Sequence, residues 1–482
     1  MGWAGRVARR LGAVAVVCGV FAGPAWAAEP GATAATPPAW EPPPVNASAL
    51  PGDPPPGPPA GVVFTQQNNC VSSNTNNAPL PDQPAAQAML NVKGAQQFSS
   101  GAGVKVAVID TGVNTNPLLT DHGRLKPGGD YLTPKAHDGR FDCDGHGTLT
   151  AGIVAANTSG HADFGFTGVA PAATIYAIRQ TSSVFSGKNA HGQDVPAGTP
   201  SSLAAAIVHA VHLGVGVITT SVDTCLPAGT AEQEMRSPGS PEQVLQAAVA
   251  YAVEHNVVVI NAAGNTSSCT PAGQNNHPDP DDVVNIEFPA VFSDDLLSVA
   301  SVSPVTGSVS TFSEWGPWVN IAAPGEGIVS VNPAVGGTGL TQFFTEPGAT
   351  SPGTIQGTSF AAPYVAGVVA LVRARFPTLT ARQVITRVEA TAQHPTGPGG
   401  RNNQVGYGIV DPVAALTESI PGQDGVPSVR DSTVPAQVPL PPAKDLTATR
   451  VALIGTGVGV ALLLVTYFVV RSLRRRRPDD PV

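Results

Sequence analysis

The interpretation of the chain depends on one stretch, Gln356-Gly357-Thr358-Ser359-Phe360-Ala361-Ala362-Pro363. Small and apolar residues at helical spacing continue from it to about Phe376, which predicts a buried helix. A serine in the first turn of such a helix is well placed to be a nucleophile, because the helix N-terminus favours negative charge and its free N–H groups can hold an oxyanion. Alternatively, Thr358 or Ser359 merely caps a core helix. The rest of the chain has to decide between these interpretations.

Buried strands and helices alternate on both sides of this stretch. Strands are expected at 104–109, 174–179, 215–220, 257–262 and 296–302, and helices at 85–98, 146–156, 201–213, 241–254, 358–376 and 380–392. This alternation implies βαβ units, so the predicted fold class is α/β, with a mostly parallel sheet sandwiched by helices. Residues 182–200 are expected to form a polar loop. The Gly-rich residues 336–353 are expected to form a flexible loop near the cleft.

The N-terminal sequence predicts a secretory signal peptide followed by a spacer. Positive residues precede an apolar run from Leu11 to Phe21, and Ala25-Trp26-Ala27 offers a cleavage site, so residues 1–27 are a predicted signal peptide. An uncleaved anchor is the alternative, which the short apolar run disfavours. The Pro/Ala-rich residues 28–60 cannot pack a core and predict an extended arm. Residues 61–89 form an N-terminal extension on the main domain, 90–419.

The C-terminal part predicts a membrane anchor. After a Pro-rich linker at 420–446, the 20 residues from Val451 to Val470 are uncharged and rich in Val and Leu. As a helix they would span about 30 Å, the thickness of a bilayer core. Arg450, Arg471 and the run from Arg474 to Arg477 place the tail, 471–482, in the cytoplasm and the main domain outside it. A buried helix of a soluble protein is the alternative.

The charge pattern argues against one class of partner. The chain has a formal net charge of −9, but its basic residues gather at the two ends. The part from Glu29 to Arg450 holds 17 Lys and Arg against 32 Asp and Glu. Such an acidic central part is unsuited to bind nucleic acid.

Three side chains with complementary chemistry follow predicted strands or open predicted helices. Asp110 ends a strand, His146 begins a helix and Ser359 begins another, so all three should meet at one edge of the sheet. His146 can take the proton of the Ser359 hydroxyl, and Asp110 can orient and stabilise the imidazole. The order Asp, His, Ser is one of the known triad orders. Asn265, at another strand end, could donate to an oxyanion together with the Ser359 N–H.

Four sequence blocks occur in order: Val106-Ala107-Val108-Ile109-Asp110-Thr111-Gly112, His146-Gly147-Thr148, Asn261-Ala262-Ala263-Gly264-Asn265 and Gly357-Thr358-Ser359-Phe360-Ala361-Ala362-Pro363. Over about residues 90–415 the chain therefore resembles the subtilisin-family serine proteases. Its layout, with a signal peptide, an extension, a protease domain, a Pro-rich linker and a membrane helix, is similar to the mycosins, proteases of actinobacterial type VII secretion systems.

This resemblance implies a function and further site residues. It implies a serine endopeptidase, without a cofactor, that acts on secreted peptide or protein substrates at the outer side of the cytoplasmic membrane. It also implies association with secretion-complex subunits, and a mainly structural role in that complex is the alternative. The resemblance places Ser221 and Val222 on one wall of the S1 pocket. Asp223 replaces the family's glycine there and would favour basic substrate side chains if it pointed inward.

The cysteines predict two disulfides. Cys18 leaves with the signal, and the remaining four lie in a compartment where cysteines oxidise, with three possible connectivities. A disulfide between Cys70 and Cys143 would hold the extension beside His146. Cys225 and Cys269 both follow strand ends and should meet at the same edge. A zinc site is the alternative, although no paired C-x₂-C spacing exists.

Other metal-binding patterns are weak, and no metal site is predicted. His209 and His212 lie three residues apart on one predicted helix and could bind a metal, but a solvated helix face is the simpler interpretation. Asp279, Asp281 and Asp282 could bind Ca²⁺, but an exposed acidic loop is expected instead.

Overall fold

The computed structural model describes residues 40–72, 80, 82–134, 136–269, 283–396, 398–423 and 447–474. These residues belong to two compact units, Met1–Asp424 and Gly425–Val482. The predicted signal peptide, the first part of the arm, most of the linker, the end of the tail and the acidic loop at 279–282 lie outside the described residues.

The elements of the chain alternate as expected. The helices are α1 (Ala85–Met89), α2 (Val92–Ala95), α3 (Pro117–Thr120), α4 (His146–Ala155), α5 (Pro200–His212), α6 (Ala228–Arg236), α7 (Pro241–Glu254), α8 (Thr358–Arg375), α9 (Ala381–Ala390), α10 (Pro412–Thr417) and α11 (Thr447–Arg474), with short 3₁₀ turns η1 (Ala47–Ala49), η2 (Asp121–Gly123), η3 (Thr266–Ser268) and η4 (Pro398–Gly400). The strands are β1 (Val63–Gln66), β2 (Lys105–Asp110), β3 (Leu125–Asp130), β4 (Thr174–Arg179), β5 (Phe185–Lys188), β6 (Asp194–Pro196), β7 (Val217–Thr220), β8 (Thr224–Pro227), β9 (Val258–Ala262), β10 (Asn285–Phe288), β11 (Leu297–Val302), β12 (Ile321–Pro324), β13 (Ser330–Val331), β14 (Leu340–Thr341), β15 (Phe343–Phe344) and β16 (Gly353–Thr354).

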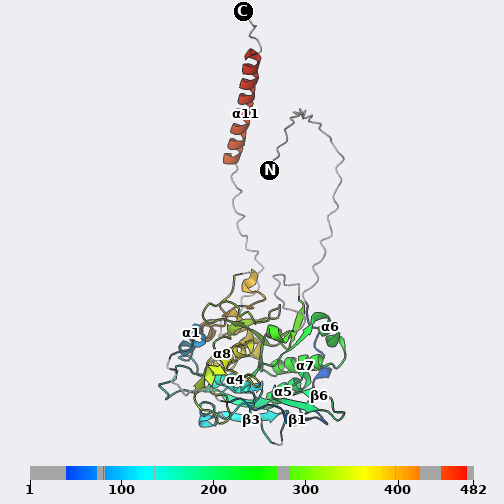
Figure 1. Cartoon of the computed structure of the whole chain (residues 1–482). Coiled ribbons are helices and arrows are strands. Elements are labelled where there is room, and N and C mark those ends of the chain that lie inside the picture. Colours follow the sequence, from blue (N-terminus) through cyan, green and yellow to red (C-terminus); the bar gives the residue numbers. More distant parts are fainter. Residues whose placement is uncertain are drawn as a thin grey trace, which may run out of the picture. The chain divides into compact units, whose positions relative to one another are not determined.

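A seven-stranded sheet in the order β12-β11-β9-β7-β2-β4-β3 organises the described part of the first unit. Its neighbouring strands are all parallel. Alternate residues of β2 supply two cores, since Val106 and Val108 join one cluster and Ala107 and Ile109 the other. Helices α4 and α8 contribute to the first cluster, and α5 and α7 pack together on the second (Figure 1). The α/β prediction is confirmed.

Helix α8 lies in the first core with nearly all of its first fifteen residues buried. Its small residues permit close packing, and a Cβ at Gly367 would collide with the side chain of Val169. The helix begins at Thr358 after Gly357, whose φ of 148° is favourable only for glycine. The close packing of these small residues therefore determines where the helix begins, and with it where Ser359 lies.

Two predictions of local structure were wrong. The segment expected as a polar loop at 182–200 contains β5 and β6, which form a three-stranded antiparallel sheet with β1 of the extension. This sheet covers only a small apolar cluster, so its strands carry many polar residues and lack a clear alternating pattern. The helix expected at 85–98 is broken into α1 and α2, because Asn91 adopts a left-handed conformation with φ of 47°.

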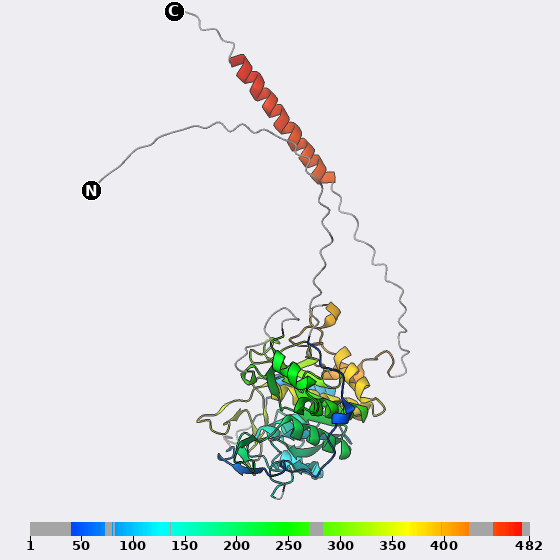
Figure 2. The same ribbon diagram turned by 90° about the vertical axis from the view of Figure 1, so that its right-hand side faces the viewer.

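The arm residues from Trp40 onward pack against other parts of the first unit, although they were expected to form a spacer. Trp40 and Leu50 pack against the second core cluster, and η1 lies against α7. Figure 2 shows this blue segment beside the green helices. The carboxylate of Asp53 accepts hydrogen bonds from Nδ1 of His209 at 3.0 Å and Nδ1 of His212 at 2.7 Å. The two histidines therefore fasten the arm to α5.

Helix α11 belongs to the second unit, and its side chains are described from residue 456 to residue 472. A search of the described residues finds no helix with enough length and apolar character to cross a membrane. The predicted membrane span from Val451 to Val470 is not confirmed. Some of its side chains lie outside the described residues.

Candidate active site

The four side chains predicted to carry catalysis line one cleft of about 680 Å³. Asp110 is the last residue of β2, Asn265 follows β9, and β7 lies between these two strands in the sheet. His146 and Ser359 stand in the first turns of α4 and α8. The carboxyl edge of the parallel sheet thus brings together residues that are up to 249 positions apart in the sequence.

Asp110 and His146 form a pair in which the carboxylate is buried and the imidazole is 27% exposed. Nδ1 of His146 lies 2.7 Å from Oδ1 of Asp110, and the backbone N–H of Thr111 donates to the same oxygen at 2.7 Å. Burial by itself would lower the pKa of His146, but the nearby charge and hydrogen bond of Asp110, with smaller contributions from Asp142 and Asp144, raise that pKa to about 9. The carboxylate therefore fixes the ring and stabilises its charged form, as a general base requires.

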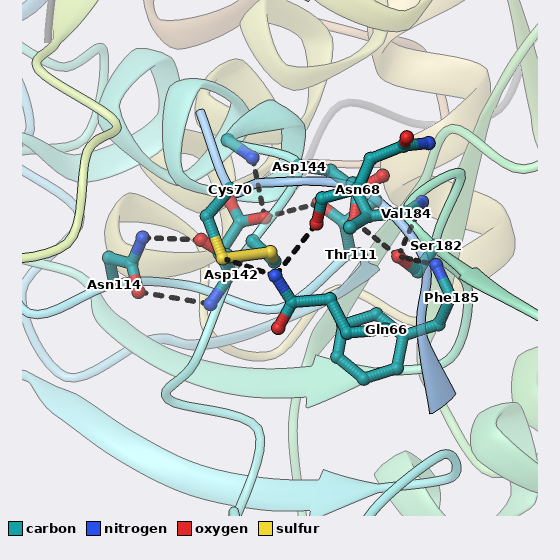
Figure 3. The surroundings of a disulfide bond; sticks show 12 residues. Gln66, Asn68, Cys70, Thr111, Asn114, Asp142, Asp144, Ser182, Val184 and Phe185 are labelled. Carbon is teal, nitrogen blue, oxygen red and sulfur yellow. Dashed lines mark hydrogen bonds between the residues drawn. A yellow bond between two sulfur atoms is a disulfide. The ribbon is translucent and has the colours of Figure 1, made fainter. Parts of the chain in front are cut away.

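Asp142 organises the turn that carries His146, a role that the sequence interpretation missed. Its carboxylate accepts hydrogen bonds from the Thr111 hydroxyl at 2.8 Å, the Gly145 N–H at 2.7 Å and the Thr148 N–H at 2.8 Å. Figure 3 shows Asp142 between Thr111 and Asn114. Burial raises the pKa of Asp142 to about 6, although these hydrogen bonds by themselves would lower it. The sequence contained a signal for this role of Asp142, since this acidic residue stands four residues before His146.

The first predicted disulfide joins the extension to this turn. Cys70 and Cys143 are bonded, and the N–H of Val71 donates to the carbonyl of Cys143 at 2.8 Å (Figure 3). On the other side of the turn, Asp144 accepts hydrogen bonds from the Ser183 N–H at 2.7 Å and from the Ser182 hydroxyl at 2.5 Å. The second predicted disulfide, Cys225–Cys269, is present as well, so the predicted pairing is confirmed.

The carbonyl group of Ser359 has an unusual partner. Pro363 lies four residues further along α8 and has no N–H to donate, so the carbonyl of Ser359 lacks its usual helical hydrogen bond. The hydroxyl of Ser221 donates to this oxygen instead, at 3.1 Å. Ser221, predicted on sequence grounds as a pocket wall, is thus also a support for the backbone of Ser359.

The side-chain amide of Asn265 is oriented by Thr358. Its oxygen Oδ1 accepts hydrogen bonds from the N–H and the hydroxyl of Thr358, each at 3.2 Å. The neighbouring backbone is held as well, because the Glu314 N–H donates to the Gly264 carbonyl at 2.9 Å and the Thr266 N–H donates to the Phe312 carbonyl at 2.9 Å. With Oδ1 engaged, Nδ2 is the group of the amide left to donate into the cleft.

The predicted substrate-binding residues Ser221, Val222 and Asp223 also line the cleft. Burial raises the pKa of the Asp223 carboxyl group, and its oxygen Oδ2 lies out of contact with solvent. The Gly-rich segment reaches the cleft as expected, since Phe344, Glu346 and Pro347 are part of the lining, but it contains the short strands β14 and β15 and is not wholly a loop.

One group among the described residues has the spacing of metal ligands: Cys225, Cys269 and Glu287. The two cysteines form a disulfide, whose sulfur atoms are not thiolate ligands. Oε1 of Glu287 lies 2.9 Å from Sγ of Cys269. Burial, with smaller contributions from Asp223 and Glu314, raises the pKa of Glu287 to about 10, so this carboxyl group is neutral at pH 7. The group is therefore a packed disulfide beside a carboxylic acid.

Comparison with known proteins identifies the family. The subtilase family (Peptidase S8) matches residues 101–408. Mycosin-1 of Mycobacterium tuberculosis (strain ATCC 25618 / H37Rv) is 41% identical over 92% of this chain and 97% of its own length. The chain belongs to the mycosins. Solved structures are similar to this mycosin as well. One is the crystal structure of MycP1 from the ESX-1 type VII secretion system, with a TM-score of 0.68, 38% identity and coverage of 79% of this chain and 98% of that one.

Another similar structure is a chain of the intact ESX-5 inner membrane complex, with a TM-score of 0.69 and 37% identity over 90% of this chain and 100% of that one. The subtilisin-like fold and the serine endopeptidase activity predicted from the sequence are thereby confirmed for this mycosin.

Proposed function

We propose that this mycosin hydrolyses peptide bonds of secreted substrates with Ser359 as nucleophile, His146 as general base and Asp110 as the residue that orients His146. The observation that carries this assignment is the 2.7 Å hydrogen bond between His146 and Asp110, in a cleft that Ser359 and Asn265 also line. Nε2 of His146 takes the hydroxyl proton while Oγ of Ser359 forms a bond to the scissile carbonyl carbon. The same proton then passes to the leaving amine as the C–N bond breaks.

The negative charge that develops on the substrate oxygen needs donors that are already in place. Nδ2 of Asn265 and the backbone N–H of Ser359, at the start of α8, supply them in this proposal. The orientation of the Asn265 amide by Thr358 supports the role, because the donor then requires no rearrangement during the reaction.

Substrate side chains are proposed to enter beside Ser221 and Val222, which line the same cleft and would form one wall of the S1 pocket. Profiling a peptide library before and after replacement of Val222 by Ala tests this placement. An altered preference for the residue before the scissile bond supports it, and an unchanged profile contradicts it.

The enzyme is further proposed to work outside the cytoplasmic membrane, held by a single C-terminal span. The support comes from the sequence, in which an uncharged run from Val451 to Val470 stands between Arg450 and Arg471 with a basic tail beyond it. Two disulfides in the first unit suit an oxidising compartment. Fractionation of cells that produce the whole chain, compared with a chain ending at residue 446, tests the anchor. Equal membrane association of both chains would contradict it.

A second role, as a structural subunit of a type VII secretion complex, is favoured by the similarity to a chain of the ESX-5 inner membrane complex. Ser359→Ala separates the two roles, because it removes the nucleophile and leaves the surface unchanged. We expect the variant to lose peptide cleavage and to retain assembly of the membrane complex. Cleavage that survives the substitution would refute the serine mechanism, and loss of assembly would tie the structural role to proteolysis.

A further inference from the structure

The hydrogen bond to Asp110 holds the imidazole of His146 at one atom, Nδ1. A ring held at one atom is still free to swing about that hydrogen bond. General base catalysis requires more, because Nε2 has to stay within reach of the serine hydroxyl from which it takes the proton. Since the imidazole is partly exposed, one side of it faces the cleft and another faces the protein. The contacts on the protein side therefore decide how far the ring can move.

The side chain of Phe360 provides a contact on that side. The centroids of the Phe360 and His146 rings are 4.9 Å apart, and the two ring planes are inclined by 40°. Aromatic pairs at such distances attract each other beyond the apolar area that they bury. Both residues line the cleft, but Phe360 is only 5% exposed. Its ring is therefore an almost fully enclosed surface that lies against the imidazole.

Phe360 itself is firmly placed. Its side chain belongs to the first core cluster, and its N–H donates to the carbonyl of Gly357 at 3.1 Å. Its Cδ2 atom lies 3.6 Å from the point where a Cβ on Gly357 would stand, so the ring also packs against the turn that starts α8. Phe360 directly follows Ser359 in the first turn of this helix. Consecutive residues of α8 thus carry the nucleophile and the ring that contacts the base.

We propose that Phe360 is a positioning residue for the general base: its ring limits the movement of the His146 imidazole, so that Nε2 stays directed at Oγ of Ser359. This inference rests on the roles proposed above for His146 and Ser359. Asp110 holds the imidazole at Nδ1, and Phe360 supports it from the side. Because the nucleophile and this support are neighbours on one helix, a small shift of α8 moves both together and preserves their arrangement.

The size of the effect follows from the contact. An aromatic pair contributes an amount that corresponds to about 2–13-fold in rate. Phe360→Leu keeps an apolar side chain but removes the ring, so kcat should fall by about 2–13-fold while KM changes by less than about twofold. Phe360→Ala removes the support altogether, and a displacement of His146 by about 1 Å should lower kcat by about 10²-fold. Phe360→Tyr keeps the ring and should stay within about threefold of the wild type.

The experiment combines two measurements on each variant. The first is kcat and KM with internally quenched peptides that carry Ala, Lys or Phe before the scissile bond. The second is the rate at which diisopropyl fluorophosphate labels Ser359, a reaction that needs the base but involves no peptide side chain. Phe360→Leu should lower kcat equally on the three peptides and lower the labelling rate by the same factor.

Phe166→Leu is the matched control. Phe166 is buried in the same core cluster but does not line the cleft. Its replacement should lower the resistance to urea, as loss of a core ring does, and should leave kcat and the labelling rate unchanged at temperatures where the protein is folded.

Each contrary result has a distinct meaning. Unchanged kcat and labelling rate in Phe360→Leu would reduce Phe360 to core packing. A KM raised on one peptide, with an unchanged labelling rate, would make Phe360 a wall of a substrate subsite. A Phe360→Tyr variant as slow as Phe360→Leu would exclude support through the ring. Wild-type labelling in His146→Ala would instead refute the base role itself. If Phe360→Ala fails to fold, the Leu and Tyr variants, which retain most of the side-chain volume, decide the question.

Discussion

Replacing Cys70 and Cys143 by serine removes the covalent link between the extension and the turn before His146. The bridge spans 73 residues of sequence, so in the chain-entropy description its loss lowers the free energy of unfolding by about 4.4 kcal/mol. The extension should nevertheless stay in place. Four residues of β1 pair with β5, and the Val71 N–H still donates to the carbonyl of residue 143.

Catalysis should be almost unaffected by this change. The turn that carries His146 is held by the hydrogen bonds of Asp142 with Thr111, Gly145 and Thr148, none of which involves the disulfide. We expect kcat of the doubly substituted enzyme to stay within about threefold of the wild type at temperatures where it is folded.

The matched control is the serine pair at Cys225 and Cys269. This bridge spans 44 residues and should stabilise the fold by about 4.0 kcal/mol, which is nearly the same amount. It also joins the loops of Asp223 and Asn265, so its loss should lower kcat by about tenfold or more. Urea unfolding and peptide hydrolysis at 20 °C, measured on both variants, separate the two effects. Equal losses of kcat in the two variants, or a loss above tenfold in the Cys70 and Cys143 variant, would refute this reasoning.

Other outcomes are expected as well. Asn265→Ala should lower kcat by about 10²–10³-fold at nearly constant KM, the range measured when a subtilisin loses one such donor; a raised KM at unchanged kcat would make it a binding residue. Because the pKa of His146 is raised to about 9 and the neutral ring is the base, kcat/KM should rise with pH up to about 9. Asp144→Asn should move this limb to lower pH, and a wild-type limb near 6.5 would contradict the assignment. The stabilisation from the charged ring is complete below the unfolded pKa of about 6.5 and disappears as pH rises through about 9. Asp53→Ala deprives His209 and His212 of their shared carboxylate. Limited proteolysis within residues 40–60 should therefore become faster, while kcat is unchanged. An unchanged rate of proteolysis would show that Asp53 does not hold the arm.

The residues of the site were predictable because each lies at the end of a strongly patterned element. Asp110 follows a run of buried apolar residues, and Ser359 opens a long apolar helix. Parallel topology then requires such ends to share one edge of the sheet. The pairing of Cys70 with Cys143 was also accessible, because a cysteine beside His146 limits where the extension can lie.

Other features depend on contacts that local patterns do not encode. Strand β5 is short, polar and paired with the extension, so nothing in its own sequence separates it from a loop. Asp53 meets His209 across 156 positions. The preference for basic substrates expected from Asp223 depends on whether its side chain points into the pocket, which local sequence does not encode.

The most direct test of the central claim is covalent labelling of the nucleophile. Diisopropyl fluorophosphate reacts with a serine hydroxyl that a histidine base activates, so the labelled protein can be digested and the modified peptide located by mass spectrometry. We predict one modification, at Ser359, with a parallel loss of peptide hydrolysis and no modification in His146→Ala. Labelling at another residue, or full hydrolysis by a protein that is completely labelled at Ser359, would contradict the assignment of Ser359 as nucleophile.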